Sequence, residues 1–520
     1  MKCSRANLFA RVSVAALVAV AVVALALSGC TRATTPSGPP TFVIAQTSEP
    51  LTLDPLLASG PTAEQIGSLV YSYLVRIDSH GQLEPDLAAR VPTSANGDIS
   101  PDGKTILYHL RRGVRWQDGA PFTAADVVAT FRAVMDPRNP VPTRLGFDQV
   151  ADIRALDATT LRVQLRGRFA PFLTYFFETE NYPILPAHVL ARIHSLSGSI
   201  FDATPIGTGP FRVEAWHRGD SLQLAANTDY FGGAPKIARL RIQFVPSPQT
   251  IVLRLQTGEA NAYLAADPFV LAQLRANRRL QLLIVPIYGF LCLSMQTRDA
   301  ALHDAAVRRA IAHAFDFGRD VALASHGILD SHEAARGLFT WAYVPRSAPA
   351  SFASLPSSLT ISIDGTRQLE RTLAVIMQQE ARHVGVALAI RTYSAQQFEA
   401  TSTDAGPLAS GNYQLALHEI LTGADPETSW LLACSQIPPA GYNVTRFCEP
   451  QVDRSLNDAL VTNDRLRRIR DYASVQDAVA RDVPFVAIAQ LREIEAIPAG
   501  MRGFGPSLET PYYHAERWQP

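Results

Sequence analysis

The first 30 residues constrain this chain more than any other segment. A basic head carrying Lys2, Arg5 and Arg11 precedes an almost unbroken run of Ala, Val and Leu over residues 12–26. Small residues follow and end at Cys30, in the order Leu-Ser-Gly-Cys. This layout is typical of a secretory signal, and the apolar run is short for a span, which needs roughly 20 residues. We therefore expect the rest of the chain to fold outside the cytoplasm.

Cys30 itself indicates how the folded part is held. A Cys directly after the small residues resembles the acylated position of a bacterial lipoprotein, where the thiol carries lipid and becomes the new N-terminus. An uncleaved transmembrane anchor is the alternative, which the short apolar run disfavours. We expect residues 1–29 to be a lipoprotein signal peptide, and residues 30–40 to be the lipidated Cys and a flexible tether rich in Thr, Pro, Ser and Gly. Removing residues 1–29 from the 520 leaves 491, enough for about three domains.

The composition excludes several classes of function. The 47 basic residues balance 47 acidic ones, so we expect no nucleic-acid partner. The sequence has no CxxC or HExxH motif and its 12 His are scattered, so we predict no metal site and no cofactor. Gly207-Thr-Gly-Pro210 lacks the Lys-Ser/Thr ending of a phosphate loop and is predicted to turn into a strand. Because no nucleophile–base set stands out either, we predict that the protein is not an enzyme.

The Cys residues after the leader fall into two groups. Cys434 and Cys448 are close in sequence in an exported chain, so we expect a disulfide between them. Cys292 lies in the apolar run 290–294 and is predicted to be a buried, inert thiol.

Strand and helix patterns alternate along the chain. Three segments alternate apolar and polar side chains, which predicts half-buried strands at 160–166, 238–245 and 359–363. After the third strand, apolar residues at helical spacing predict one buried helix face with the members Leu369, Leu373, Ile376, Met377 and Val384. Gly385 and a strand over 386–390 then complete a β-α-β unit. Two further helix starts have a capping side chain, Thr123 (with Asp126 three residues on) and Asp304.

Four blocks of residues are informative as an ordered set. The first runs from Glu84-Pro-Asp-Leu-Ala88 to Thr123-Ala-Ala-Asp-Val127, the second from Gly207-Thr-Gly-Pro-Phe211 to Gly258-Glu259, the third from Asp304 to Asp316, and the fourth from Asp453 through Tyr472 and Gln476 to Asp482-Val-Pro484. Together they resemble the extracytoplasmic solute-binding proteins of family 5, which serve ABC importers of peptides, nickel and related solutes. The Gly and Asp residues of these blocks suit turns and helix starts, and Trp116 in the first is predicted to pack. The blocks therefore indicate a fold and a transport role but no ligand.

The resemblance implies an α/β fold of the two-lobed periplasmic-binding-protein type, in the large three-subdomain form of type II. In such proteins a solute is trapped between lobes joined by hinge strands. We expect the hinge strands near Val285–Leu291 and Ala487–Ile494. The expected division of the chain is lobe I at 41–70, 201–286 and 494–520, a subdomain inserted in lobe I at 71–200, and lobe II at 287–493.

The resemblance also suggests where a ligand would be held. In peptide-binding members, an Asp a few residues before an Asp-Pro-like turn often holds the amino terminus of the peptide. Aligned on Asp425-Pro426, that position here is Thr422, and Glu419 or its neighbour replaces the preceding Trp. A neutral hydroxyl cannot neutralise an ammonium, so either Glu419 or Asp425 takes that role or the ligand has no free amino terminus. The complete set of ligand-binding candidates is Tyr288, Glu419, Thr422, Asp425, Trp430, Tyr442 and Asn443, with core packing as the alternative for Trp430.

Taken together, these features predict a lipid-anchored solute-binding protein of an ABC importer, located in the periplasm or at the cell surface. It would capture a small solute, which we expect to be a short peptide, and deliver it to permease and ATPase partners as a monomer. Two alternatives keep the same fold. One binds a metal–chelator complex or another cationic solute, and the other is an envelope sensor lipoprotein with no part in transport.

Overall fold

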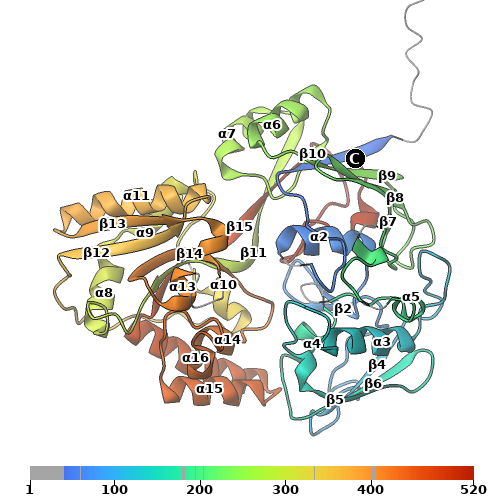
Figure 1. Ribbon diagram of the computed structural model, residues 1–520, viewed down its shortest axis with the longest axis horizontal. Coiled ribbons are helices and arrows are strands. Elements are labelled where there is room, and N and C mark those ends of the chain that lie inside the picture. The colour runs from blue at the N-terminus through green and yellow to red at the C-terminus, as the bar shows by residue number, and fades with distance from the viewer. Residues whose placement is uncertain are drawn as a thin grey trace, which may run out of the picture. The chain divides into compact units, whose positions relative to one another are not determined.

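Two long antiparallel strands, β11 (Leu280–Met295) and β15 (Phe485–Pro498), connect the two halves of the fold (Figure 1). The computed structural model describes residues 40–520 apart from 59, 179–181, 194, 203, 333 and 401–405, and residues 41–520 form one compact unit. The predicted signal peptide and Cys30 lie outside the described residues. Within the described part of the chain, no helix is long and apolar enough to cross a membrane.

Both strands belong to a ten-stranded mixed sheet. Its order is β13-β12-β14-β11-β15-β10-β1-β9-β8-β7. We call the half from β10 to β7, with the segments attached to it, lobe I, and the half from β14 to β13, with its helices, lobe II. The remaining strands of this sheet are β1 (Thr41–Gln46), β7 (Phe211–His217), β8 (Ser221–Ala226), β9 (Arg239–Phe244), β10 (Ala262–Tyr263), β12 (Ser358–Asp364), β13 (Ala387–Tyr393) and β14 (Leu415–Leu421).

The pairing of β11 with β15 is interrupted where the chain passes from one lobe to the other. Leu280–Pro286 pairs with β15 on the lobe I side, and the ladder resumes only at Phe290, on the lobe II side. Between them, Gly289 has a φ of 147°, and a Cβ there would lie 2.8 Å from the carbonyl oxygen of Ile420. A break in a ladder removes backbone hydrogen bonds that would resist bending. This irregularity is therefore the position at which we expect the lobes to rotate.

Lobe I carries a segment with two small antiparallel sheets. One is the hairpin β2 (Val75–Ile77) and β3 (Leu83–Pro85), and the other has the order β4 (Thr105–His109), β6 (Thr160–Leu165) and β5 (Val150–Ala155). An aromatic cluster around Phe147 and Phe176, whose ring centroids are 5.1 Å apart, fills the core beneath the second sheet. The helices of lobe I are α2 (Pro61–Val70), α3 (Ala124–Met135), α4 (Phe172–Tyr175), α5 (Ala187–Leu190), α6 (Pro248–Thr257) and α7 (Leu271–Ala276), with 3₁₀ turns at η1 (Phe147–Gln149), η2 (Ile200–Asp202), η3 (Pro268–Val270) and η6 (Ala515–Arg517).

Lobe II is a sheet covered on both faces by helices. Ile361 of β12 and Leu417 of β14 belong to a core cluster with α9 and α11, whereas Phe290 and Cys292 of β11 pack in a second cluster with α10, α14, α15 and α16. Parallel strands covered on both faces account for the nearly continuous buried run of β12. The helices of lobe II are α8 (Ala305–Ala314), α9 (Phe317–Ala324), α10 (Arg336–Phe339), α11 (Gln368–His383), α12 (Ala395–Phe398), α13 (Pro407–Ser410), α14 (Ser429–Leu432), α15 (Pro450–Leu460) and α16 (Arg465–Asp482), with 3₁₀ turns at η4 (Thr340–Ala342) and η5 (Cys434–Gln436).

Most local predictions are confirmed. β12, α11 and β13 form the expected β-α-β unit, with β12 and β13 parallel. Thr123 and Asp126 make a reciprocal capping box at α3, and the Asp304 carboxylate accepts the Ala306 N–H at the start of α8. Cys292 is buried and takes no part in a disulfide. The predicted face of α11 is wrong at its end, because Val384 already lies past the helix and is 45% exposed.

The structure explains the residue type at two positions of the family blocks, Gly207 and Trp116. Gly207 packs directly against the carbonyl group of Val70, and a Cβ at this position would overlap that group. The segment then enters β7, which confirms the predicted turn into a strand. Trp116 is 2% exposed and meets the ring of Phe122 edge-on, which confirms that it packs.

Candidate functional site

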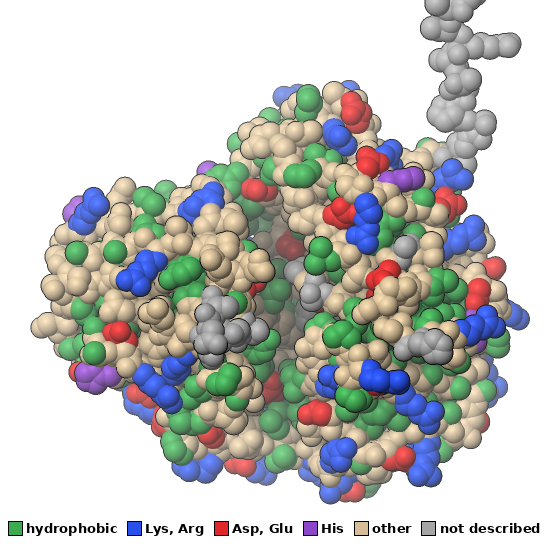
Figure 2. All heavy atoms as spheres, viewed as in Figure 1, with side chains coloured by type: hydrophobic (Ala, Val, Ile, Leu, Met, Phe, Trp, Pro, Cys, Tyr) green, Lys and Arg blue, Asp and Glu red, His purple; other side chains and the backbone are tan. Residues whose placement is uncertain are grey.

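A groove separates the two lobes, and two cavities lie along it (Figure 2). The first, which we call the hinge cavity, has a volume of about 350 Å³. The second, which we call the aromatic cavity, has a volume of about 330 Å³. Both volumes are at the small end of the range of about 300–1,000 Å³ that is usual for small-molecule sites. Side chains of both lobes line each cavity, so a bound solute would contact both.

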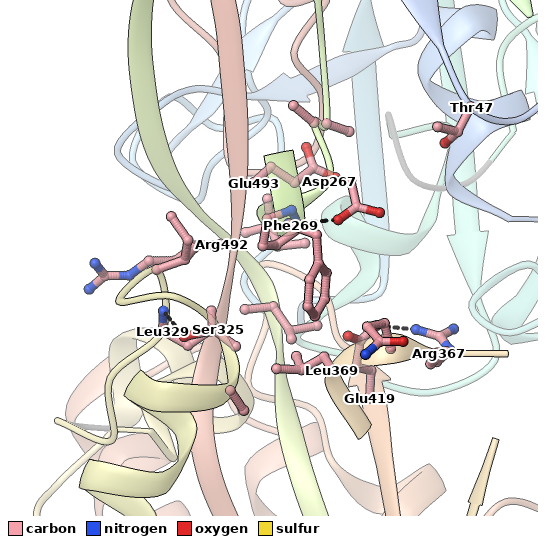
Figure 3. A pocket seen from close by; sticks show the side chains of 18 of the residues that line it. Thr47, Asp267, Phe269, Ser325, Leu329, Arg367, Leu369, Glu419, Arg492 and Glu493 are labelled. Atoms are coloured by element: carbon pink, nitrogen blue, oxygen red, sulfur yellow. Dashed lines mark hydrogen bonds and ion pairs between the residues drawn. The ribbon is translucent and has the colours of Figure 1, made fainter. Parts of the chain in front are cut away.

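The hinge cavity has charged groups at opposite ends (Figure 3). Glu493 of β15 and Asp267, just before η3, lie together on the lobe I side, and Arg367 and Glu419 lie together on the lobe II side. The ring of Phe269 stands between these two groups. The cavity therefore offers acidic and basic contacts, and an apolar surface, within one small volume.

Two glutamates at alternate positions of β15 form the acidic end. Glu493 and Glu495 lie on the same face of the strand, because side chains alternate between faces. Burial raises the pKa of Glu493 from its ordinary 4.5 to about 7, opposed by hydrogen bonds from Gln65, at 3.3 Å, and from Glu495. Glu495 is fully buried and accepts the Ala265 N–H at 3.1 Å. Burial, and then the nearby charge of Glu493, raise the pKa of Glu495 well above its ordinary value. Burial thus disfavours the charged form of both carboxyl groups, and the pKa of Glu493 lies near neutrality.

The basic end lies at the start of α11. Arg367 is the residue that precedes this 16-residue helix, and no side chain from the described residues caps it. Its guanidinium is ion-paired with four carboxylates, those of Glu419, Glu399 at 3.5 Å, Asp364 at 3.6 Å and Glu370 at 3.8 Å. The N–H groups and the dipole of a helix N-terminus favour negative charge, whereas the guanidinium of Arg367 is already surrounded by carboxylates of the protein. At this end of the cavity, the start of α11 is therefore the feature that suits a carboxylate.

The two predicted anchoring carboxylates are already paired with arginines. Glu419 is ion-paired with Arg367, and Asp425 accepts two hydrogen bonds from Arg468 at 2.5 and 2.8 Å. The Asp425 and Arg468 side chains are each only 7% exposed. Each of these carboxylates thus has its charge balanced within the protein before any solute arrives.

Thr422, Tyr288 and Asn443 hold the protein's own backbone or core. The Thr422 hydroxyl donates to the Gly337 carbonyl at 2.5 Å, so it fixes the loop after β14 to α10. Tyr288 packs in a small cluster with Ile77 and Ala424. Asn443 is fully buried, and its amide donates to the carbonyls of Ala433 and Phe447 at 3.1 and 2.7 Å.

Four of the predicted ligand-binding residues line the aromatic cavity, namely Thr422, Asp425, Trp430 and Tyr442. The ring centroids of Trp430 and Tyr442 are 6.5 Å apart in an edge-to-face arrangement, and Tyr442 is 59% exposed. Tyr175 reaches this cavity from α4 of lobe I, and its hydroxyl donates to Glu427 at 3.4 Å. The structure thus assembles from both lobes an aromatic surface of which the sequence indicated only one side.

The loop that carries Tyr442 is closed by a disulfide. Cys434 and Cys448, 14 residues apart, are bonded, which confirms the predicted pairing. Closing a loop of about 15 residues contributes about 3 kcal/mol in the chain-entropy treatment. The cross-link therefore keeps Tyr442 and the buried Asn443 in place at the edge of the groove.

Several residues of the cavities were not predicted. Arg367, Asp267, Phe269 and Tyr175 sit in unremarkable polar or aromatic runs, so no local pattern distinguishes them. Glu493 had a recognisable signal, since Glu493 and Glu495 interrupt one face of an otherwise apolar strand. Among the described residues, no group of three or more His, Cys, Asp or Glu is placed to hold a metal ion.

Comparisons with known proteins show a matching family model and a sequence relative of similar length. Residues 82–330 match the model of the bacterial extracellular solute-binding proteins, family 5 middle. The glutathione-binding protein GsiB of Escherichia coli O6:K15:H31 (strain 536 / UPEC) is 25% identical over 503 residues, which cover 93% of this chain and 95% of that protein.

Two solved structures share the fold. NikZ from Campylobacter jejuni, in complex with Ni(L-His), has a TM-score of 0.76 at 23% identity and covers 92% of this chain and 99% of its own. The oligopeptide-binding protein AppA from Bacillus subtilis, in complex with a nonapeptide, has a TM-score of 0.75 at 17% identity and covers 93% and 99%. The predicted fold class, an α/β two-lobed periplasmic binding protein of type II, is confirmed.

Proposed function

Because the chain belongs to the bacterial extracellular solute-binding proteins of family 5, we propose that it captures a short peptide between its lobes for delivery to the permease of an ABC importer. The observation that carries the proposal is the hinge cavity, which is lined from both lobes and has charges of both signs. A solute in such a cavity gains its full set of contacts only when the lobes close, so binding favours the closed arrangement.

The charges of the hinge cavity suit a zwitterion. Glu493 and Asp267 favour an ammonium, and the N-terminus of α11 favours a carboxylate. The aromatic cavity offers a flat apolar surface for a side chain of the same solute. The sequence relative that is named for glutathione supports a peptide-like solute, since glutathione is itself a tripeptide.

Native mass spectrometry of the purified protein tests this function. After incubation with a pool of random tripeptides, we expect complexes of one peptide per protein. Small-angle scattering should show a smaller radius of gyration for the loaded protein, as the lobes close. A pool of neutral trisaccharides is the control and should not be retained. If no tripeptide were retained, or if the trisaccharides were retained equally, the peptide proposal would be wrong.

The membrane anchor is part of the same proposal. A lipid on Cys30 and the tether over residues 30–40 would hold the lobes near the permease. The proposal also keeps the lobe boundaries and the monomeric state that are predicted from the sequence. Cys30→Ser should move the protein from the membrane fraction to the soluble extracytoplasmic fraction, because it removes the acylated thiol. Cys3→Ser, also within the leader, is the matched control and should leave the protein membrane-bound. Membrane attachment of Cys30→Ser would contradict the lipid anchor.

A further inference from the structure

Glu493 is a carboxylate of the hinge cavity that, within the described residues, neither forms an ion pair nor caps a helix. We propose that it binds the protonated amino group of the solute, which makes the hinge strand β15, and not the loop after β14, the anchor for the amino terminus. This inference rests on the proposed function and assigns one end of the peptide to one end of the hinge cavity.

The other carboxylates around the cleft are already engaged. Glu419 is paired with Arg367 and Asp425 with Arg468. The Asp267 carboxylate accepts the backbone N–H of Phe269 at 2.8 Å, which fixes it as the cap of η3. An ammonium placed at Glu419 or Asp425 would have to compete with a guanidinium held by the fold.

Glu493 differs from these carboxylates in its partners. Within the described residues it forms no ion pair, and its contacts are the carboxyl group of Glu495 and a long hydrogen bond, at 3.3 Å, from the Gln65 amide on α2. Arg492 precedes it on β15, but its guanidinium points away from the acidic end and pairs with Asp330 at 3.1 Å (Figure 3). Adjacent residues of a strand lie on opposite faces, which explains why this neighbour does not neutralise Glu493.

A second feature behind Glu493 also points to a missing cation. Glu495 is fully buried on the same face of β15, and one of its carboxyl oxygens accepts no hydrogen bond from the described residues. Its other oxygen accepts the N–H of Ala265, a residue that lines the hinge cavity. Glu493 and Glu495 are thus two carboxyl groups in contact that form no ion pair within the described part of the chain, although Arg367 and Arg492 line the same cavity. When both are ionised they repel each other, and a bound cation would lower that cost.

The position of Glu493 would couple amine binding to closure. Glu493 follows Arg492, which pairs with Pro286 at the last step of the ladder before the interruption in β11. An ammonium held there lies at the hinge, and the remainder of the peptide extends toward lobe II and Arg367. The two termini of the solute would then bridge the lobes.

Paired tripeptide pools test the assignment. One pool has free amino termini and the other is the same pool N-acetylated, and both are titrated against the wild-type protein and Glu493→Gln by native mass spectrometry. We expect the wild type to prefer the free-amine pool by about 10- to 100-fold, the range for one hydrogen-bonded charged group. Glu493→Gln should lose that preference, whereas Glu214→Gln, an exposed glutamate on strand β7 of the same sheet, should keep it.

The outcomes separate this inference from the proposed function. If Glu493→Gln still preferred the free-amine pool, the inference would be overturned while the peptide function stood. If the wild type retained neither pool, the proposed function itself would fail. Glu419→Gln and Asp425→Asn complete the experiment, because loss of the preference in either of them, with Glu493→Gln unaffected, would return the anchor to β14 or to the loop that follows it. Since Glu493→Gln removes one of two neighbouring acids and retains the shape of the side chain, we expect it to fold.

Discussion

Replacing Arg468 with Ala is expected to lower the free energy of unfolding by about 3–5 kcal/mol. Arg468 of α16 holds Asp425 by two hydrogen bonds, and both side chains are buried. Without the guanidinium, Asp425 would be left as an uncompensated charge beside Glu427, itself a buried carboxyl group. Urea denaturation followed by circular dichroism measures the loss.

Two variants decide whether the pair acts as a unit. Arg467→Ala changes an exposed arginine on the same helix and should alter the free energy of unfolding by about 0.5 kcal/mol or less. Asp425→Leu combined with Arg468→Met replaces the pair by apolar side chains and should recover most of the loss, because no charge is then left unpaired. A loss below about 1 kcal/mol for Arg468→Ala would show that Asp425 is solvated, and so available to a ligand after all.

Glu493→Gln should stabilise the ligand-free protein at neutral pH while it weakens binding. The pKa of Glu493 is raised by burial from 4.5 to about 7, so the folded protein retains a proton that the unfolded chain releases. For a group of this kind, the unfolded state binds fewer protons between these two pH values, and stability falls as the pH rises from about 4.5 to about 7. At about 1.36 kcal/mol per pH unit, removing this group should add roughly 3 kcal/mol at pH 7.5 and almost nothing at pH 4.

Thermal and urea unfolding at pH 4, 5.5 and 7.5 measure how the stability of the wild type and of Glu493→Gln depends on pH. The wild type should lose stability relative to Glu493→Gln as the pH rises, and Glu214→Gln should run parallel to the wild type. The groups that face Glu493 are Glu495 on β15, Gln65 on α2, Asp267 before η3 and Tyr512 near the C-terminus. A difference that does not change with pH would mean that Glu493 is well solvated when the cleft is empty. A variant that is more stable but binds its ligand more weakly is expected where a binding residue destabilises the ligand-free protein.

The sequence indicated the local elements because local rules create them. The capping box at Thr123, the cap at Asp304 and the β-α-β unit from 358 to 393 each depend on residues a few positions apart. The disulfide was likewise expected from two Cys in an exported chain and is present in the structure. The end of α11 was misplaced at Val384, since a helix boundary depends on a backbone turn that an apolar side chain does not reveal.

The ligand anchor is where reasoning from the sequence stopped. Glu419 and Asp425 look like free carboxylates when only their neighbours in the chain are considered. Their partners, Arg367 and Arg468, stand 52 and 43 residues away and are brought to them by the packing of α11 and α16 against the sheet. Charge balance in a folded protein is a property of such long-range neighbours, so the sequence could not say which acid remains unpaired.

The sequence by itself determined the class of protein, because helix caps, turn glycines and the four family blocks are all local or ordered patterns. Only the tertiary structure decided what the cleft offers a solute. It joined the lobes through β11 and β15, interrupted their ladder at residues 286–290, and left Glu493 at the cavity wall without an ion pair to any described residue. The physical reason is that a binding site is defined by which groups remain unsatisfied after folding, and that is known only once every other group has found its partner.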